Sequence, residues 1–298
     1  MRCKYRTVLA VDGGGIRGVV PLTLLKYIEK TCYEIDPDID MINWIDVFSG
    51  TSTGAIISGA LMLRDEKERS IFTPERILQL YLQPPPPPPP RDVSTKSAMP
   101  AYPLKLILEN NFGEVNISGI SKHFLFVSYD LNADSPFIFT DRMDRYRNVS
   151  LAKVMMACSA VPGYFPPVEL GDKQLADGIL TAKNPSKLAY EYAKLYYPDD
   201  PIVVISLGTG DLPSDQHDMI EHEMNRVHNE MEALSRVDKK LIYFRFQPQI
   251  RHANSMMDDT NAENLNNLMK DANEYIEGNK NVFDRLFKLM SIRADSYI

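Results

Sequence analysis

Apolar residues along this chain fall into short runs that alternate with stretches of helical character. Five runs rich in Val, Ile, Leu and Phe have the length and composition of β-strands, at residues 7–11, 44–49, 124–131, 201–210 and 241–246. The first two runs each lead into a glycine-containing turn and then into a helical stretch. This alternation predicts a mainly parallel sheet with helices on both faces, the α/β class.

Residues 281–292 predict an amphipathic helix, because four apolar side chains recur at helical spacing with Arg285 and Lys288 beside them. The four are Phe283, Leu286, Phe287 and Met290. Two interpretations follow. The helix packs its apolar face on the protein core, or it presents that face to a membrane surface.

Seven consecutive prolines interrupt the pattern from Pro84 to Pro90. Such a run forms an extended left-handed helix, which suits a stiff exposed loop or a ligand for a protein partner that binds proline-rich segments. No internal repeat or domain boundary is evident. We therefore expect a single domain over residues 1–298, with its motifs within about 7–210 and a mainly helical portion over 211–298.

Composition and charge narrow the functional classes. The 298 residues are 44% hydrophobic and 24% charged, which is typical of a globular protein with a sizeable core. The formal net charge of -7 does not favour a nucleic-acid partner or general attraction to anionic membranes. The three cysteines are scattered, which argues against a disulfide scaffold or a zinc site.

The sequence contains no apolar run long enough for a secretory signal or a transmembrane helix. We therefore expect a cytoplasmic protein that is at most peripheral at membranes.

The segment 12–18 reads DGGGIRG and lies between a predicted strand and a predicted helix. It has the G-x-G-x-x-G spacing of dinucleotide-binding loops, although a single match is a weak signal. Adjacent glycines also allow successive backbone N–H groups to converge on one anion at a helix N-terminus. That anion could be a phosphate or the oxyanion of an acyl-transfer intermediate. Arg17 adds a positive charge to the loop.

The segment 50–54 reads GTSTG and places Ser52 between two glycines, after an apolar strand and before an apolar helix. This context is the one that the G-x-S-x-G nucleophile elbow requires. The alternative is a turn that only caps a helix. With an anion-binding loop in the preceding strand–helix unit, the pattern favours a reactive serine.

A reactive serine needs a base, and the histidines are poor candidates, because His123 lies between Lys122 and a predicted strand and the other four lie in polar segments. His222 and Glu223 begin an H-E-x-x-H zinc motif, but Arg226 occupies the position of the second histidine. Asp177 is the better candidate, because it lies between a small residue and a glycine after the turn VPGYFPP. Burial would raise the pKa of its carboxyl enough to make it a useful base.

These segments together resemble the patatin-like phospholipases. DGGGIRG, GTSTG and the Asp-Gly pair at 177–178 occur in the family's order, and FTPERI, ACSAVPGYFPP, ISLGTG and MDDTNAENLNNL resemble further family segments. The resemblance covers roughly residues 7–276. It implies a three-layer α/β/α sandwich with a mainly parallel central sheet, and a Ser–Asp dyad without histidine.

The resemblance also implies a function, that of a lipid acyl hydrolase of the phospholipase A or lysophospholipase type. The substrate would be a phospholipid or another glycerolipid, met through transient contact with a membrane surface, and catalysis would need no metal or other cofactor. Each site residue takes a role from the matching motif: Ser52 is the nucleophile, Asp177 the general base, Gly13, Gly14 and Gly15 the oxyanion donors, and Arg17 their support.

The chain departs from the family pattern at two places. Ile179 stands where a second small residue usually follows Asp-Gly, and the proline run replaces a loop of ordinary composition. Three other functions stay open at this point. They are an acyltransferase with the same dyad, a nucleotide-binding protein that uses the two glycine loops, and a lipid-binding scaffold without activity.

Overall fold

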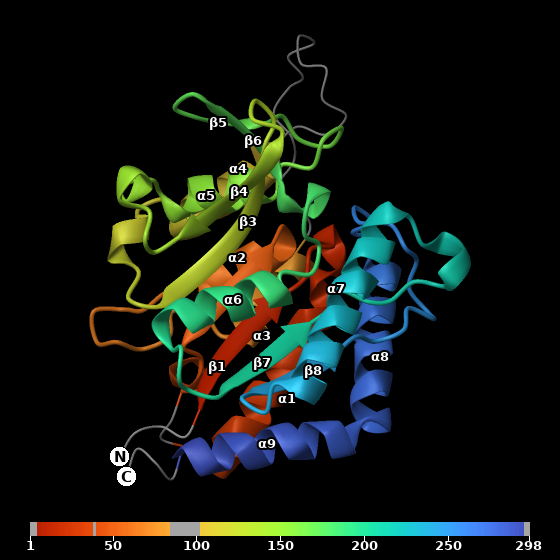
Figure 1. Cartoon of the computed structure of the whole chain (residues 1–298). Coiled ribbons are helices and arrows are strands. Elements are labelled where there is room, and N and C mark those ends of the chain that lie inside the picture. The colour runs from red at the N-terminus through yellow and green to blue at the C-terminus, as the bar shows by residue number, and fades with distance from the viewer. Residues whose placement is uncertain (1–4, 38–39, 84–101, 295–298) are drawn as a thin grey trace.

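A computed structural model describes residues 5–37, 40–83 and 102–294 of the chain. The proline run at 84–90, with its possible protein partner, lies outside the described residues. The arrangement of the described elements is shown in Figure 1.

An eight-stranded sheet forms the centre of the molecule, in the order β5-β6-β3-β2-β1-β7-β8, with β4 paired to β3 (Figure 1). Five consecutive strands of this order are parallel, and they are the five that the sequence predicts to within a few residues at their ends. These are β1 (Arg6–Val11), β2 (Val47–Thr51), β3 (His123–Asp130), β7 (Ile202–Leu207) and β8 (Leu241–Phe246). The expected α/β fold is confirmed.

Three strands that the sequence analysis missed are antiparallel. They are β4 (Ser135–Thr140), β5 (Val168–Leu170) and β6 (Lys173–Asp177). Each is short or mixes polar and apolar residues, so none forms an apolar run. Their pairing with β3 and with each other decides their conformation, which local composition does not.

Helices form a layer on each face of the sheet (Figure 1). On one face lie α6 (Ser186–Tyr196) and α7 (Met219–Val237), whose buried side chains meet those of β1, β2, β7 and β8. The larger layer on the other face comprises α1 (Val19–Ile35), α2 (Thr53–Leu61), α3 (Pro74–Leu82), α4 (Tyr102–Phe112), α5 (Leu151–Cys158), α8 (Ala262–Gly278) and α9 (Lys280–Ala294).

Short 3₁₀ helices connect several of these elements. They are η1 (Gly15–Gly18), η2 (Met41–Trp44), η3 (Ile117–Gly119), η4 (Asp144–Tyr146), η5 (Gly178–Leu180) and η6 (Ser214–Gln216). Two of them, η1 and η5, follow the carboxyl ends of β1 and β6; η1 contains Gly15 and Arg17, and Asp177 directly precedes η5.

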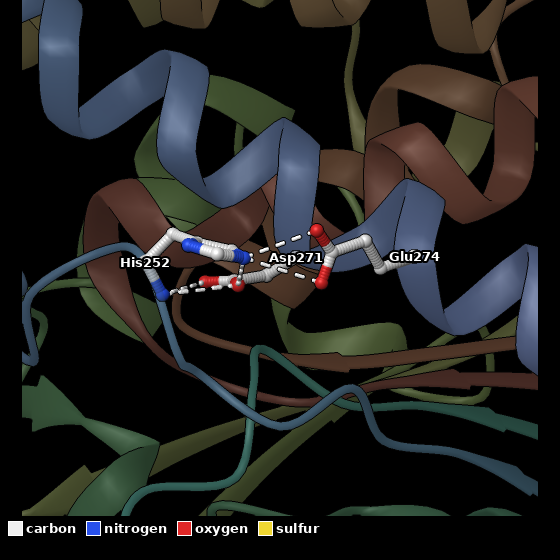
Figure 2. A group of neighbouring side chains, drawn as sticks. All are labelled: His252, Asp271 and Glu274. Atoms are coloured by element: carbon white, nitrogen blue, oxygen red, sulfur yellow. Dashed lines mark hydrogen bonds and ion pairs between the residues drawn. The ribbon is translucent and has the colours of Figure 1, made fainter.

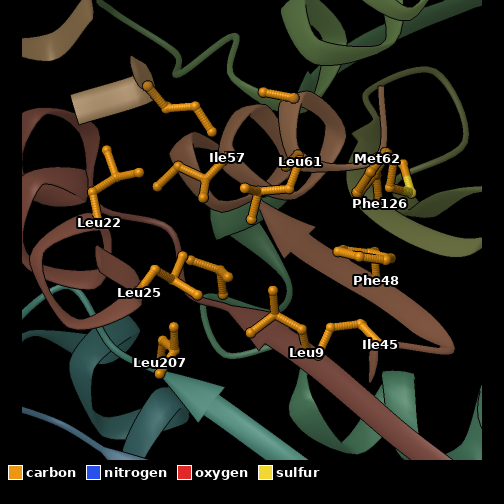
Figure 3. Close-up of a cluster of buried hydrophobic side chains, with 14 of the residues drawn as sticks. Leu9, Leu22, Leu25, Ile45, Phe48, Ile57, Leu61, Met62, Phe126 and Leu207 are labelled. Atoms are coloured by element: carbon orange, nitrogen blue, oxygen red, sulfur yellow. The ribbon is translucent and has the colours of Figure 1, made fainter. Parts of the chain in front are cut away.

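Side chains on each strand alternate between the two helical layers, which divides the core into two clusters. In β1, Leu9 packs toward α1 and α2, whereas Val8 and Ala10 pack toward α6 and α7. Figure 3 shows the larger cluster, with side chains of the sheet beneath those of α1 and α2. Its labelled members are Leu9, Leu22, Leu25, Ile45, Phe48, Ile57, Leu61, Met62, Phe126 and Leu207.

Helix α9 belongs to the core and not to a membrane-binding surface. All four apolar residues of its predicted face are buried, and the Phe283 ring stacks on Phe246 with a centroid distance of 4.5 Å. Tyr27 of α1 meets the rings of Phe283 and Phe287 edge-on. The membrane interpretation of this helix is therefore wrong, because its apolar face is already covered. Among the helices in the described ranges, none has the combination of length and apolar composition needed to span a bilayer.

Candidate active site

Ser52 occupies a strained turn between β2 and α2. Its backbone has φ 54° and ψ -124°, a conformation that non-glycine residues rarely adopt. A Cβ on Gly50 would lie 2.2 Å from the backbone of Gly54, and a Cβ on Gly54 would lie 2.1 Å from the Val11 carbonyl oxygen. The two glycines therefore allow the turn to close and to pack against the end of β1. The strand–turn–helix context expected from the sequence is present.

Asp177 is brought to the same place by the pairing of β3. Thr51 pairs with Val127, and Asp177 pairs with Ser128, so the ends of β2 and β6 face consecutive residues of one strand. The Thr51 hydroxyl also donates a hydrogen bond of 2.6 Å to the Ala182 carbonyl oxygen. Ser52 and Asp177, which are far apart in the sequence, are therefore neighbours in the fold.

The Asp177 carboxyl is fully buried. Its Oδ1 accepts a hydrogen bond of 2.8 Å from the Ile179 N–H, and its Oδ2 has no hydrogen-bond partner among the described residues. Burial raises the pKa of Asp177 to about 7, although the Ser52 hydroxyl and the Ile179 N–H both lower it. A pKa near neutrality suits a general base.

The contact between Ser52 and Asp177 is loose. The serine hydroxyl is close enough to lower the pKa of the carboxyl, yet no bond between the two side chains meets ordinary limits of hydrogen-bond length and angle. A nucleophile and its base are often slightly apart in unliganded sites and tighten when substrate binds. The position of the two groups is compatible with proton transfer.

The glycine loop lies beside the Ser52 turn. A Cβ on Gly13 would lie 3.3 Å from the Ser52 Cβ. The Gly13 N–H donates to the Lys183 carbonyl oxygen at 3.0 Å, so it is not free to bind an anion, contrary to the expectation from the sequence. The N–H groups of Gly14 and Gly15 make no hydrogen bond to other described residues. These two remain as candidate oxyanion donors.

Thr209 and Met257 hold the glycine loop in place, and the sequence analysis assigned no role to either. The Thr209 hydroxyl donates to the Gly13 carbonyl oxygen at 2.7 Å, and the Met257 carbonyl oxygen accepts from the Ile16 N–H at 2.8 Å. A Cβ on Gly14 would lie 2.3 Å from the Thr209 Oγ1. Gly15 has φ 58°, which also favours glycine at its position.

Arg17 does not reach solvent but joins a buried group of charges beneath the loop. Its side chain is 3% exposed and its Nη2 lies 3.5 Å from Oε1 of Glu221 on α7. The same oxygen accepts from the Lys183 ammonium group. Burial lowers the pKa of both Arg17 and Lys183. Arg17 thus supports the loop from behind through an ion-pair network.

Asp12, the residue before the glycines, forms a second buried pair with Arg245 of β8. The Arg245 Nη1 lies 2.8 Å from the Asp12 Oδ1 and 2.8 Å from the Ser206 hydroxyl. The sequence analysis missed Arg245, Lys183 and Glu221. An arginine within the otherwise apolar strand LIYFRF was the one local signal, since a charge in such a strand needs a buried partner.

An apolar cavity of about 410 Å³ opens beside Ser52. Side chains of α2, α3 and α4 form much of its wall, and the Tyr81 hydroxyl of α3 bonds to the hydroxyl of Thr53, the residue after Ser52. None of the described histidines is among the lining residues. The residues that line it are Gly15, Ile16, Ser52, Thr53, Ile56, Ile77, Leu80, Tyr81, Gln83, Leu104, Ile107, Leu108, Phe112, Ser159, Val161, Tyr164, Phe165, Met257, Asp258 and Thr260.

His252, Asp271 and Glu274 form a cluster with metal-ligand spacing in the described part of the chain (Figure 2). The Asp271 carboxylate accepts hydrogen bonds from the backbone N–H groups of residues 251–253. The His252 Nε2 lies 3.1 Å from a Glu274 oxygen. These contacts give the cluster a structural role, because they anchor on α8 the loop that leads to Met257.

Comparison with known proteins assigns the family. The sequence model of the family described as Patatin-like phospholipase matches residues 9–190, more than half of the chain. The chain belongs to the patatin-like phospholipase family. The matched region contains the glycine loop, Ser52 and Asp177.

Patatin-like relatives occur in several plants. Patatin-like protein 1 of Arabidopsis thaliana is 26% identical over 68% of this chain and 58% of its own length. Patatin-like protein 2 of Oryza sativa subsp. indica is 27% identical over 70% of this chain and 62% of its own length. The chain thus matches about 60% of the length of these patatin-like relatives.

Membership of the family does not by itself establish catalysis. A Solanum tuberosum relative, 28% identical over 68% of this chain and 62% of its own length, is named Probable inactive patatin-3-Kuras 1. Among solved structures, VipD from Legionella pneumophila is 11% identical with a TM-score of 0.40, over 91% of this chain and 67% of that chain. Likeness at that TM-score carries no argument about the patatin-like site, whose chemistry depends on its own geometry.

Proposed function

We propose that this patatin-like protein is a lipid acyl hydrolase of the phospholipase A or lysophospholipase type, acting through a Ser52–Asp177 dyad. One observation carries the proposal: a serine on a strained elbow adjoins a buried carboxyl with a pKa of about 7, at the wall of an apolar cavity. The cavity suits an acyl chain, and the two side chains suit nucleophilic attack on its ester.

In the first half of the reaction, the Asp177 carboxylate takes the proton of the Ser52 hydroxyl as Ser52 Oγ attacks the ester carbonyl carbon. The N–H groups of Gly14 and Gly15, together with the N-terminus of α2, stabilise the negative charge that develops on the carbonyl oxygen. The leaving alcohol then receives the proton from Asp177. The product of this half-reaction is an acyl-enzyme on Ser52.

Arg17 contributes through the loop and not by touching substrate. Its buried guanidinium and Lys183 share Glu221, which fixes the backbone on which the oxyanion donors lie. A preorganised donor set is effective because little reorganisation is needed as charge develops. No histidine takes part in this scheme.

The rival functions fit the site less well. A nucleotide would place phosphates and a polar sugar against a cavity whose wall is mainly aliphatic and aromatic. An inactive scaffold would not need a strained serine beside a buried carboxyl. An acyltransferase would use the same residues and differs only in whether water or an alcohol takes the acyl group.

Fatty acid release from defined phospholipid vesicles, measured with excess chelator, tests the proposal. Ser52→Ala should abolish release and labelling by a fluorophosphonate probe, and Asp177→Asn should lose three or more decades of rate, on the order seen when an activating group is removed. The rate of fatty acid release by His228→Ala should stay within a few-fold of the wild-type rate. A histidine variant as inactive as Asp177→Asn would contradict the dyad, and labelling that persists in Ser52→Ala would contradict the nucleophile.

A further inference from the structure

The Ser159 hydroxyl is a buried polar group of the cavity that the dyad mechanism leaves unused. Ser159 follows α5, is 5% exposed, and lines the same cavity as Ser52. Its Oγ has no hydrogen-bond partner among the described residues. Because buried hydroxyls are normally hydrogen-bonded, this atom is expected to bind a group that enters the cavity.

The end of α5 lies directly beside the proposed base. The Asp177 N–H donates to the carbonyl oxygen of Ala160 at 3.0 Å. The Cys158 thiol is near enough that, after burial, the Asp177 carboxylate is the next cause of its raised pKa. Asp177 Oδ2 and Ser159 Oγ are thus unpartnered buried oxygens on two adjoining segments.

Most other polar side chains of the cavity are already engaged or lie toward solvent, and the remaining one, Asp258, has a buried Oδ1 without a partner among the described residues. Thr53 and Tyr81 bond to each other, and Tyr164 has interactions elsewhere. Gln83 and Thr260 are exposed, and Asp258 is half-buried on the loop that precedes α8. Among the hydroxyl groups of the described cavity other than that of Ser52, the Ser159 hydroxyl is therefore the one that is both buried and free to bind a new partner.

Resting on the proposed function, we propose that Ser159 Oγ and Asp177 Oδ2 together bind the water that hydrolyses the acyl-enzyme. The water oxygen attacks the acyl carbon while Asp177 takes one of its protons. The tetrahedral intermediate then collapses, the bond from the acyl carbon to Ser52 Oγ breaks, and Oγ regains the proton from Asp177. The fatty acid leaves and the dyad is restored.

The Ser159 hydroxyl can hold this water in either sense, because a hydroxyl both accepts and donates hydrogen bonds. One O–H of the water bonds to Asp177 Oδ2, and the water then accepts from the Ser159 hydroxyl or donates its second O–H to it. An alcohol can accept from the same hydroxyl. Ser159 therefore positions the group that attacks the acyl-enzyme and does not itself exclude an alcohol.

Ser159→Ala tests this inference, with Ser49→Ala as a matched control. Ser49 Oγ is likewise buried and unpartnered, but Ser49 does not line the cavity. It lies two residues after Val47, which packs in the α6 and α7 layer, so its side chain faces that layer. The control removes a chemically identical group from the opposite face of the sheet.

The measurements separate formation of the acyl-enzyme from its hydrolysis. A p-nitrophenyl ester reports acylation as a burst of p-nitrophenolate, intact mass reports decay of the acyl-enzyme, and added methanol reports the ratio of methyl ester to free acid. We expect Ser159→Ala to slow decay of the acyl-enzyme about 10- to 100-fold, on the order of losing one buried hydrogen bond. The burst rate should change less than about threefold, because p-nitrophenolate leaves without proton donation. The ratio of methyl ester to free acid should stay within about threefold of the wild-type ratio, because the Ser159 hydroxyl can bond to either acceptor.

Ser159→Ala should be at least as stable to urea as wild type, because it removes an unpartnered buried hydroxyl. If it does not fold, Ser159→Cys provides a similar volume with a weaker hydrogen-bonding group, and the same slow decay is expected. A folded variant whose acyl-enzyme decays at the wild-type rate would overturn the inference and leave the dyad intact. A wild-type protein without any Ser52-dependent release of p-nitrophenolate, either as a burst or in the steady state, would overturn the proposed function, and this inference with it.

Discussion

The Lys183 carbonyl oxygen accepts a hydrogen bond from the Gly13 N–H, with a nitrogen–oxygen distance of 3.0 Å. This bond ties the segment that follows Asp177 to the glycine loop. The Lys183 ammonium group also bonds to Glu221, which lies 3.5 Å from the Arg17 guanidinium. The proposed base and the proposed oxyanion loop are therefore held by one residue and by one buried carboxylate.

Glu221→Gln should lower stability and activity together. Removing one charge of a buried ion pair leaves the partner uncompensated, and such changes typically cost about 3–5 kcal/mol. The rate constant kcat should fall more than KM changes, because the variant disturbs the oxyanion loop and not the cavity. Urea unfolding and steady-state kinetics measure the two effects.

Glu223→Gln is the control for Glu221→Gln. Glu223 pairs with Arg226, whose side chain is 59% exposed, so its replacement should cost less than about 1 kcal/mol. Equal losses of stability and of kcat in the two variants would show that the buried ion-pair network does not position the glycine loop.

The hydrolytic rate should depend on the protonation of Asp177. Burial raises the pKa of this carboxyl to about 7, and only the carboxylate can act as a base. We expect kcat/KM to fall about tenfold per pH unit below pH 7 and to level off above it. A profile measured with a neutral soluble ester that stays flat down to pH 5 would contradict the assignment.

Asp177→Asn should be more stable than wild type at high pH. The pKa of the folded-state carboxyl is raised from 3.8, so its contribution to stability is fully present below about pH 4 and is lost as pH rises through 7. The asparagine side chain does not titrate between pH 4 and pH 8. The free energy of unfolding of Asp177→Asn should therefore exceed that of wild type by an amount that grows with pH, to on the order of 4 kcal/mol. Urea unfolding at pH 4.5 and pH 8 measures the change.

The exposed Asp172 provides the control, since Asp172→Asn changes the same functional group at the surface. The difference in free energy of unfolding between Asp172→Asn and wild type should be about the same at pH 4.5 and at pH 8. If Asp177→Asn gains the same free energy of unfolding over wild type at both pH values, the Asp177 carboxyl is not held out of solvent as described.

Gly14→Ala should damage both the fold and the activity. The new Cβ would lie 2.3 Å from the Thr209 Oγ1, and Thr209 is fully buried. Loss of one oxyanion donor typically costs about 2.7–4 kcal/mol of transition-state stabilisation, and the clash adds a loss of folding stability.

A double-mutant cycle with Thr209→Gly separates the two effects of Gly14→Ala. This second change removes all three Thr209 atoms that the Cβ would meet, so the double variant should lose less stability than the sum of the single variants. Strict additivity would mean that the two positions do not contact each other as described.

The sequence by itself determined the local parts of the molecule. Apolar runs gave the five parallel strands, and the two glycines around Ser52 specify a turn that bulkier residues could not close. These features depend on a few neighbouring residues, whose sterics and hydrophobicity act over short distances. Motif spacing was therefore sufficient to find the serine and the glycine loop.

Only the tertiary structure decided what surrounds those parts. The register of β3 brings Asp177 beside Ser52, and the packing of α3 and α4 forms the cavity. The segment after η5 uses the Lys183 carbonyl oxygen to bond the Gly13 N–H, and packing against α1 and β8 covers the apolar face of α9. Burial raises the pKa of a carboxyl, and burial is a property of all the segments that exclude water from it.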